Sequence, residues 1–347
     1  MKRRRLTSLD VARLAGVNQS TVSRALRPDG RVSAETRAKV QAAAEQLGYT
    51  PNAIARSLIT QRTNIIGILT ADLTNPFQPS ILEKFLHKMQ ALERQVLVFT
   101  AMPDQQVDDL LPMALQYQVD ALVVTFATLS SQSLLECSRN GTRVVLFSRY
   151  MEAGQVSSVT GDNVAAGRRI AAFLWDQGHR DFAYIGGDPN SSTNRDREHG
   201  FMSLLWERGA AKPLQESAGR YSYEEGREAA NRLLMRAGPL DAIFCAADPI
   251  AIGTIDAARE AGLRVPEDLS IVGFDDIPMA CWEAYSLTTI RLPIDEMIDA
   301  TIDLLLQEPN AQQAPVHKIF PGKLIERRST QIRDMAPREE RVKARST

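Results

Sequence analysis

The stretch SLDVARLAGVNQSTVSRAL, residues 8–26, contains two short helical patterns separated by a single glycine. Its first half carries apolar residues on one face of a helix: Leu9, Val11, Ala12 and Ala15. Thr7 or Ser8 can cap this helix, and Gly16 predicts its end, because a turn between two closely packed helices often needs a positive φ. Asn18 then caps a second helix over 19–26, in which Val22 and Leu26 face inward. The stretch therefore predicts a helix-turn-helix unit.

The second predicted helix exposes hydrogen-bonding side chains: Gln19, Ser20, Thr21, Ser23 and Arg24. The N-terminal end of such a helix is where base edges are usually read in the major groove of DNA. A third helix follows, capped by Ser33 and stopped by Gly48, with Val40, Ala43, Ala44 and Leu47 at helical spacing. A small helical domain with one polar helix could instead be a protein-docking module, and the local charge separates the two interpretations.

The charge of the chain is divided unequally along its 347 residues. Residues 1–62 contain 12 Lys and Arg against 4 Asp and Glu, a net charge of +8, whereas the remainder is −9. Because Lys and Arg drive affinity for the phosphate backbone, a basic head on an acidic body favours DNA over a protein as the partner of the head.

Residues 64 onward alternate short β-branched runs with amphipathic helical stretches. A first series of strand-like runs covers 65–69, 96–100, 121–125 and 143–147, and a second covers 181–187, 241–247 and 270–274. Near-continuous apolar strands separated by helices indicate parallel sheets covered on both faces. We therefore expect an all-α headpiece plus an α/β bilobal core of two doubly wound sheets, with a ligand-binding cleft between the lobes.

Several functional classes find no support in the sequence. Cys137, Cys245 and Cys281 lack metal or redox spacing, the four histidines form no metal-ligand pair, and no nucleotide-binding or GxSxG motif occurs. No cofactor, no metal and no enzymatic activity are therefore expected. Neither an apolar segment after the basic start nor a membrane-spanning run is present, so we expect a cytoplasmic protein, nucleoid-associated when bound to DNA.

The quoted stretch resembles the headpiece of the lac repressor family, and YTPNAIARSL, residues 49–58, resembles that family's hinge helix. The resemblance runs on to about Arg328. It implies that Gln19 and Ser20 set operator specificity, that Arg24 reaches a base or phosphate, and that the phosphate backbone is held by Thr7, Ser23, Arg31, Ser33 and Thr36. The DNA-binding set that it implies comprises Thr7, Asn18, Gln19, Ser20, Thr21, Ser23, Arg24, Arg31, Ser33, Thr36, Asn52, Ala55 and Leu58.

The hinge segment is barely two turns long after Pro51, too short to be a stable helix alone in water. It is expected to form only when DNA and a partner subunit pack against it. By resemblance, Leu58 is the apolar wedge that enters the minor groove and kinks the duplex; without the resemblance it reads as an ordinary core leucine.

The resemblance also places effector-binding residues at strand ends. NRDREHGF, residues 194–201, carries the pocket arginine, Arg197, three residues before a glycine, and GFDD supplies Asp275 as a carboxylate acceptor. The effector-binding set that it implies comprises Phe77, Ser148, Arg149, Asp162, Thr193, Arg197, Tyr221, Ala247 and Asp275. Asp275 could instead cap a turn, and Phe77 could belong to the core.

Two departures from the family pattern bear on the ligand. Ser148 stands where an aspartate is common, and Ala247 where an asparagine is common. With Arg149, Arg195 and Arg197 nearby, the loss of an acid favours an anionic effector, a sugar acid or phosphosugar, over a neutral sugar. The alternative is that Arg149 and Arg195 pair with acids on the surface.

The expected organisation is a headpiece over 1–50, a hinge over 51–63 and a core over 64–328. The first lobe would hold about 64–161 and 291–328, the second about 162–290, and residues 329–347 would be a charged, disordered tail without a leucine heptad. The function implied is a ligand-responsive repressor that binds a pseudo-palindromic operator as a homodimer. The core alone would also suit an exported solute-binding protein, but neither the basic headpiece nor the absence of a signal sequence fits that class.

Overall fold

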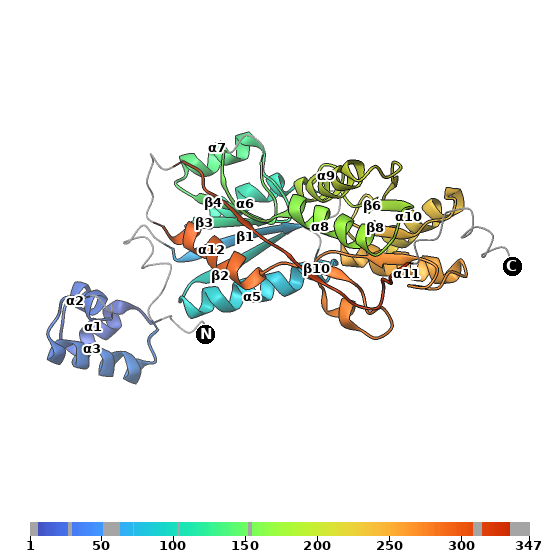
Figure 1. The fold of residues 1–347 in the computed structure, drawn as a ribbon. Helices are drawn as coiled ribbons and strands as arrows, with labels where there is room; N and C mark the ends of the chain where they lie inside the picture. The colour runs from blue at the N-terminus through green and yellow to red at the C-terminus, as the bar shows by residue number, and fades with distance from the viewer. Residues whose placement is uncertain are drawn as a thin grey trace. The chain divides into compact units, whose positions relative to one another are not determined.

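The computed structural model describes residues 6–26, 30–50, 63–71, 73–102, 105–151, 155–307 and 314–333 (Figure 1). It divides into two compact units, Met1–Asn64 and Ile65–Thr347. The predicted hinge residues Asn52, Ala55 and Leu58 lie outside the described residues.

The first unit contains the three predicted helices α1 (Ser8–Ala15), α2 (Gln19–Ala25) and α3 (Ala34–Leu47). They enclose a small apolar cluster that includes Val11, Val22 and Val40, each fully buried. Gly16 and Gly48 end α1 and α3 in the left-handed conformation, and the Ser33 hydroxyl accepts from the Thr36 amide at the start of α3. The predicted helix-turn-helix is confirmed.

The second unit begins with a six-stranded parallel sheet in the order β11-β5-β4-β3-β1-β2. Its strands are β1 (Ile65–Ala71), β2 (Gln95–Ala101), β3 (Ala121–Thr125), β4 (Arg143–Phe147), β5 (Ser157–Gly161) and β11 (His317–Phe320). Its helices are α5 (Phe77–Ala91), the 3₁₀ helix η1 (Val107–Leu110), α6 (Leu111–Gln116), α7 (Ser131–Arg139) and α12 (Ile294–Leu306).

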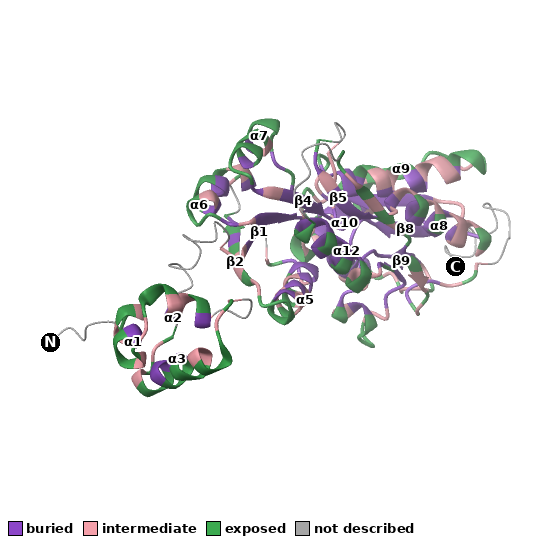
Figure 2. Ribbon diagram, turned by 90° about the vertical axis from the view of Figure 1, so that its left-hand side faces the viewer, coloured by how far each residue is buried: buried purple, intermediate pink, exposed green. Residues whose placement is uncertain are grey.

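The side-chain alternation along these strands separates two apolar layers. Val123 and Val145 pack with Phe85 of α5, whereas Leu122 and Leu146 pack with Leu111 of α6 and Cys137 of α7. Figure 2 shows the inner strands, such as β1, as a buried layer between helices whose outer faces are exposed, whereas the edge strands β2 and β11 are partly exposed. The sheet is thus covered on both faces, as its near-continuous apolar strands predict.

A second parallel sheet has the order β7-β6-β8-β9 and forms the second lobe. Its strands are β6 (Phe182–Gly186), β7 (Leu214–Ser217), β8 (Ala242–Cys245) and β9 (Ser270–Val272). Its helices are α8 (Asn163–Asp176), α9 (Ser192–Glu207), α10 (Tyr223–Arg236) and α11 (Asp248–Glu260), and a 3₁₀ helix, η2, covers Pro278–Cys281. The predicted fold class, two doubly wound lobes after a helical headpiece, is confirmed. None of the helices in the described ranges is long and apolar enough to cross a membrane.

Within the described residues, the chain passes between the lobes at three places. The first crossover is where β5 leads into α8. The other two lie side by side as an antiparallel pair of strands, β10 (Thr289–Arg291) and β12 (Lys323–Ile325). The chain lies against the second lobe at Ser329, directly after the predicted first-lobe segment 291–328. The Ile271 amide donates to the Ser329 carbonyl (2.8 Å), and the Ser329 hydroxyl donates to the Ile271 carbonyl (2.6 Å).

The expectation of a disordered tail from residue 329 is wrong for residues 329–333. Ser329 and Thr330 are buried, and the Arg333 amide donates to the Gln177 carbonyl (2.7 Å). The Ser329 hydroxyl bonds to backbone groups of Ile271 and Thr288, and the Thr330 hydroxyl lies 3.0 Å from the Thr288 hydroxyl, so two small polar residues in a charged segment are fixed beside β9.

His179 is fully buried between the end of α8 and the start of β9. Its Nδ1 lies 3.0 Å from the Leu174 carbonyl and its Nε2 lies 2.8 Å from the Ser270 hydroxyl, so these partners assign a neutral ring that donates from Nδ1. Burial lowers the pKa of His179 from 6.5 to about 4.

We expect His179→Gln to flatten the dependence of the unfolding temperature on pH between about 4 and 6.5. Because the folded-state pKa is depressed, the unfolded chain binds the proton more tightly in this window, so the contribution of His179 to stability rises with pH and is complete above 6.5. Thermal unfolding across pH 4–8 checks this, with His87→Gln on the exposed face of α5 as the matched control. Equal pH profiles for the wild type and His179→Gln would contradict it.

Candidate functional site

The outer face of α2 presents the predicted DNA-reading side chains. Asn18, Gln19, Ser20 and Arg24 are exposed, and Thr21 and Ser23 are half-buried above the buried Val22 and Ala25. Gln19 Nε2 donates to the Ser8 hydroxyl (2.9 Å), and Arg24 Nε donates to the Ser20 carbonyl (3.2 Å). The helix therefore offers a continuous polar surface on an apolar base.

Arg37 of α3, which was not predicted as a site residue, fixes the end of α2. Its two terminal nitrogens donate to the carbonyls of Ala25 and Gly30, each at 2.7 Å. The Ala25 carbonyl at the C-terminus of α2 has no partner within the helix, so the guanidinium satisfies it, and a second bond joins Gly30, beyond the helix, to α3.

The residues predicted to hold the phosphate backbone are mostly exposed. Thr7, Arg31 and Ser33 are exposed, and Thr36 is half-buried. Thr7 and Ser33 also have structural roles, since the Thr7 hydroxyl donates to Asp10 (2.8 Å) and Ser33 caps α3.

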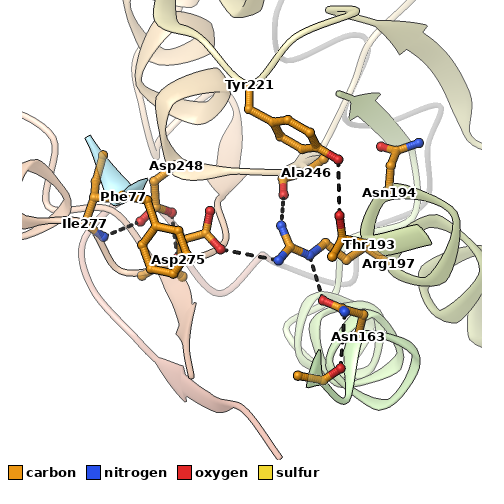
Figure 3. A network of polar contacts seen from close by, with 12 residues as sticks. Phe77, Asn163, Thr193, Asn194, Arg197, Tyr221, Ala246, Asp248, Asp275 and Ile277 are labelled. Carbon is orange, nitrogen blue, oxygen red and sulfur yellow. Dashed lines mark hydrogen bonds and ion pairs between the residues drawn. The ribbon is translucent and has the colours of Figure 1, made fainter. Parts of the chain in front are cut away.

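In the core, Arg197 is the centre of a buried polar network, drawn in Figure 3. Its Nε donates to the Asn163 side chain (2.9 Å), Nη1 to the Ala246 carbonyl (2.6 Å) and Nη2 to Asp275 (3.3 Å). The guanidinium also lies 3.5 Å from the centre of the Phe274 ring. Each nitrogen of Arg197 thus bonds to the protein, so the guanidinium holds four elements together.

Gly200 explains why the arginine stands three residues before a glycine. A Cβ at Gly200 would lie 2.1 Å from the Val164 carbonyl oxygen, so α9 can approach α8 closely only with glycine there. This approach brings Arg197 against Asn163 at the first position of α8.

Asp275 lies in a strained loop at the end of β9. Its φ is +113° and that of Asp276 is +54°, both unusual for residues with a Cβ. Burial raises the pKa of Asp275 to about 6, opposed by the charge and hydrogen bond of Arg197. The carboxylate is not an ordinary turn cap: it faces a buried guanidinium on one side and a cavity on the other.

That cavity, of about 550 Å³, is lined by residues of both lobes. Phe77 and Asp275 face it together, as the effector prediction requires, and Lys84, Ile277, Arg291 and Arg327 contribute to its walls. Phe77 is buried and makes an edge contact with Phe126, so it serves the core and the cavity at once.

Thr193 and Tyr221 meet in a hydroxyl cluster of the second lobe. The Tyr221 hydroxyl donates to Ser191 (3.0 Å) and lies 3.4 Å from Thr193 Oγ1. Figure 3 shows Tyr221 above Arg197, on the side away from Asn163.

The other predicted effector residues are placed elsewhere. Asp162 caps α8 through the Ala165 amide (3.0 Å) and lines a second cavity of about 380 Å³ with Tyr150 and Asp196. Ser148 is buried with φ +71°, and Ala247 precedes α11 with its methyl group buried.

The positive charge that the sequence predicts around the effector site is partly balanced by neighbouring carboxylates. Asp275 faces Arg197, and Asp188 lies 3.6 Å from Arg149, whose side chain is largely buried rather than on the surface as the alternative interpretation held. Burial lowers the pKa of Arg149. Arg195 is exposed and donates to the Asn190 carbonyl (3.3 Å).

Sequence reasoning missed Asp248, which is fully buried beside Asp275. Burial and the neighbouring charge of Asp275 raise the pKa of Asp248 to about 7. The available signal was its position directly after the predicted strand 241–247, where a carboxylate at the first turn of a helix also favours the helix dipole. Among the described residues no group of His, Cys, Asp and Glu could hold a metal ion.

Comparison with known proteins supports the division into headpiece and core. Residues 7–52 match the model for bacterial regulatory proteins of the lacI family, and residues 171–330 match a periplasmic binding protein-like domain. The chain is 35% identical to the HTH-type transcriptional regulator DegA of Bacillus subtilis, covering 84% of this chain and 88% of that one. It is 32% identical to the HTH-type transcriptional repressor PurR of Erwinia tasmaniensis, covering 93% and 96%.

Among solved structures, the fold is similar to the lac repressor dimer bound to operator and the anti-inducer ONPF. The TM-score is 0.85 at 26% identity, over 94% of this chain and all of that one.

Arg197→Met is expected to destabilise the core by roughly 3–5 kcal/mol, because it leaves the buried Asp275 carboxylate without its cation. Arg197→Met combined with Asp275→Asn should recover a large part of that loss, since no unpaired buried charge remains and asparagine tolerates a positive φ. Chemical unfolding of the single and double variants measures the difference; a double variant no more stable than Arg197→Met would contradict the ion-pair interpretation. Arg168→Met, which removes a solvent-exposed pair with Glu207, serves as the control and should change the stability far less than Arg197→Met, because an exposed ion pair is screened by water.

Proposed function

We propose that this chain, which belongs to the lacI family of bacterial regulatory proteins, represses transcription as a homodimer on a pseudo-palindromic operator and responds to a small polar metabolite bound between its lobes. It is a DNA-binding transcriptional regulator with a periplasmic-binding-protein-like core. The observation that carries the proposal is the exposed polar face of α2, on a headpiece segment of net charge +8. Its place of action is the cytoplasm, on the DNA of the nucleoid.

In this proposal Gln19 and Ser20 read base edges, and Arg24 reaches a base or phosphate farther along the groove. Thr7, Ser23, Arg31, Ser33 and Thr36 set the register by holding phosphates, and Asn18 and Thr21 support them at the start of α2. Asn52, Ala55 and Leu58 complete the interface as a hinge that forms on DNA, with Leu58 as the minor-groove wedge.

Homodimerisation follows from the symmetry of the target. One recognition helix covers only one half-site, and a two-fold dimer places a second helix on the other half of a pseudo-palindrome. The similarity to the lac repressor dimer, which is described as bound to operator, supports this arrangement.

The effector is proposed to lie against Phe77 and Asp275, which face one cavity. Ser148, Arg149, Asp162, Thr193, Arg197, Tyr221 and Ala247 would shape or reach the same region as the lobes move. Arg197 directs one bond from each nitrogen to the protein and does not line the cavity, whereas Asp275 lines it and is an acceptor, so the site favours a ligand that donates hydrogen bonds. A neutral sugar fits this chemistry better than the sugar acid or phosphosugar considered from the sequence.

The mechanism is a shift in population between two lobe arrangements. A ligand that binds one arrangement better favours it, and the crossover segments pass the change to the first lobe and the hinge. Binding at the two sites is then thermodynamically coupled.

The operator prediction uses the full chain and a pool of random duplex DNA. Selection should enrich a pseudo-palindrome, and affinity for it should fall steeply as salt rises because counterions are released from phosphates. Gln19→Ala and Ser20→Ala should change which bases are preferred, with losses of about 1–3 kcal/mol per base contact. Arg31→Ala, a proposed phosphate contact, is the control and should weaken all sequences alike. Recovery of no common sequence would overturn operator binding.

The effector prediction is tested by calorimetric titration of D-ribose, D-glucose, D-gluconate and glucose 6-phosphate into the wild type. We expect a neutral sugar to bind and Asp275→Leu to weaken it at least tenfold, because the acceptor for its hydroxyls is lost. Glu283→Gln, an exposed carboxylate near η2, should leave binding unchanged. Tight binding of gluconate or the phosphosugar, with both neutral sugars inert, would reverse the assignment in favour of an anion.

A further inference from the structure

Asp248 connects three parts of the second lobe through one buried side chain. It is the first residue of α11 and is fully buried. Its Oδ2 accepts from the Ile277 amide (2.9 Å), and its Oδ1 accepts from the Thr289 hydroxyl (2.6 Å). Its own amide donates to the Phe274 carbonyl (2.8 Å). Figure 3 shows Asp248 bonded to Ile277 beside Asp275.

These bonds brace the loop that carries Asp275, residues 273–277, here called the Asp275 loop. The loop contains two residues with positive φ, Asp275 and Asp276, a conformation that persists only when its surroundings impose it. Gly273 makes the bracing possible, because a Cβ there would lie 2.2 Å from Asp248 Oδ1. Any side chain at position 273 would therefore clash with the Asp248 carboxylate.

The second hydrogen bond of the Asp248 carboxylate, to Thr289, reaches the crossover strand β10. The Asp275 loop already runs beside this strand, since the amides of Gly273 and Asp275 donate to the carbonyls of Thr288 and Ile290, each at 2.9 Å. The bond to Thr289 adds a side-chain contact to the strand. β10 continues within a few residues into α12, which packs on the sheet of the first lobe.

Asp276 reinforces the same connection from the other side of the loop. Its carboxylate pairs with Arg291 of β10 and with Arg327, which follows β12 (2.7 Å to Arg327). Both strands of the crossover pair are therefore tied to the loop that carries Asp275.

We propose that Asp248 is a positioning residue that couples the Asp275 loop to the crossover strand β10, so that a displacement of Asp275 is transmitted toward the first lobe. Asp248 does not need to contact the effector: it holds the loop through Ile277 and the strand through Thr289. The role of this coupling in an effector response rests on the proposed function.

Hydrogen exchange of the full chain, without any ligand, tests the coupling directly. Asp248→Ala should accelerate exchange about tenfold or more in peptides covering both 273–278 and 287–291, because it removes the hydrogen bonds to Ile277 and to Thr289. Thr289→Val removes only the hydrogen bond between Thr289 and Asp248, so it should accelerate exchange in 287–291 alone. Asp248→Asn keeps an acceptor for Ile277 and a donor for Thr289, so its exchange should be close to that of the wild type.

Asp241→Ala is the matched control, since Asp241 is a buried carboxylate of the same lobe that accepts from the Arg180 amide (2.9 Å). It should accelerate exchange near 180–182 and leave 273–278 unchanged. Acceleration confined to 273–278 in Asp248→Ala would overturn the coupling to β10. So would Asp248→Asn behaving as Asp248→Ala, or Asp241→Ala reproducing the same pattern.

A second measurement joins the coupling to function, using whichever of the four sugars tested above binds the wild type. Thr289→Val should bind that sugar within about threefold of the wild type but show at least a fivefold smaller change in operator affinity on adding it. A full response in Thr289→Val would overturn the role in signalling. If the wild type binds none of the four sugars, the proposed effector is wrong, whereas the exchange result still decides the coupling.

Discussion

The guanidinium of Arg197 must be satisfied away from water, and much of the core's second lobe is arranged to do so. A buried cation is tolerated only when its donors are bonded and its charge is balanced, because desolvation otherwise costs several kcal/mol. Here the donors go to the first residue of α8, to the carbonyl at the end of β8 and to the carboxylate that follows β9. One side chain of α9 thereby fixes the relative positions of the strand ends at which ligands of doubly wound sheets are usually bound.

The same constraint explains the strained backbone at Asp275. A carboxylate that must face Arg197 on one side and a cavity on the other cannot adopt the relaxed conformation of a free loop. The structure stabilises this strain with acceptors and ion pairs from β10, from Arg327 and from Asp248. The residue best placed to sense a ligand is thus also tied to the strands that lead to the other lobe, which is a physical basis for communication between them.

The headpiece must present a polar surface on helices that enclose only a small apolar core. Its apolar cluster is small, and α2 contributes little more than Val22 and Ala25 to it. Most of the remaining side chains of α2 are therefore free to form a polar surface. Arg37 bonds to the Ala25 carbonyl at the end of α2 and to the Gly30 carbonyl beyond it, so the C-terminal end of the helix is held, whereas Gln19 and Ser20 at its N-terminal end are exposed.

Local sequence determined the elements of this protein. The helical spacing of apolar residues within each segment, as in Val40, Ala43, Ala44 and Leu47, predicts the helices of the helix-turn-helix, together with the caps at Ser33 and Gly48. The continuous apolar strands predict the two parallel sheets, because periodicity and capping act within a few residues. The family pattern also singled out Arg197 and Asp275. Tertiary structure alone decided that these two residues, 78 positions apart, form an ion pair, and that Asp188 lies close enough to Arg149 to balance part of its positive charge. It also decided that Ser329 and Thr330 return to β9 and that Asp248 braces the Asp275 loop. Such contacts join residues distant along the chain, and no local periodicity encodes which strand ends will meet.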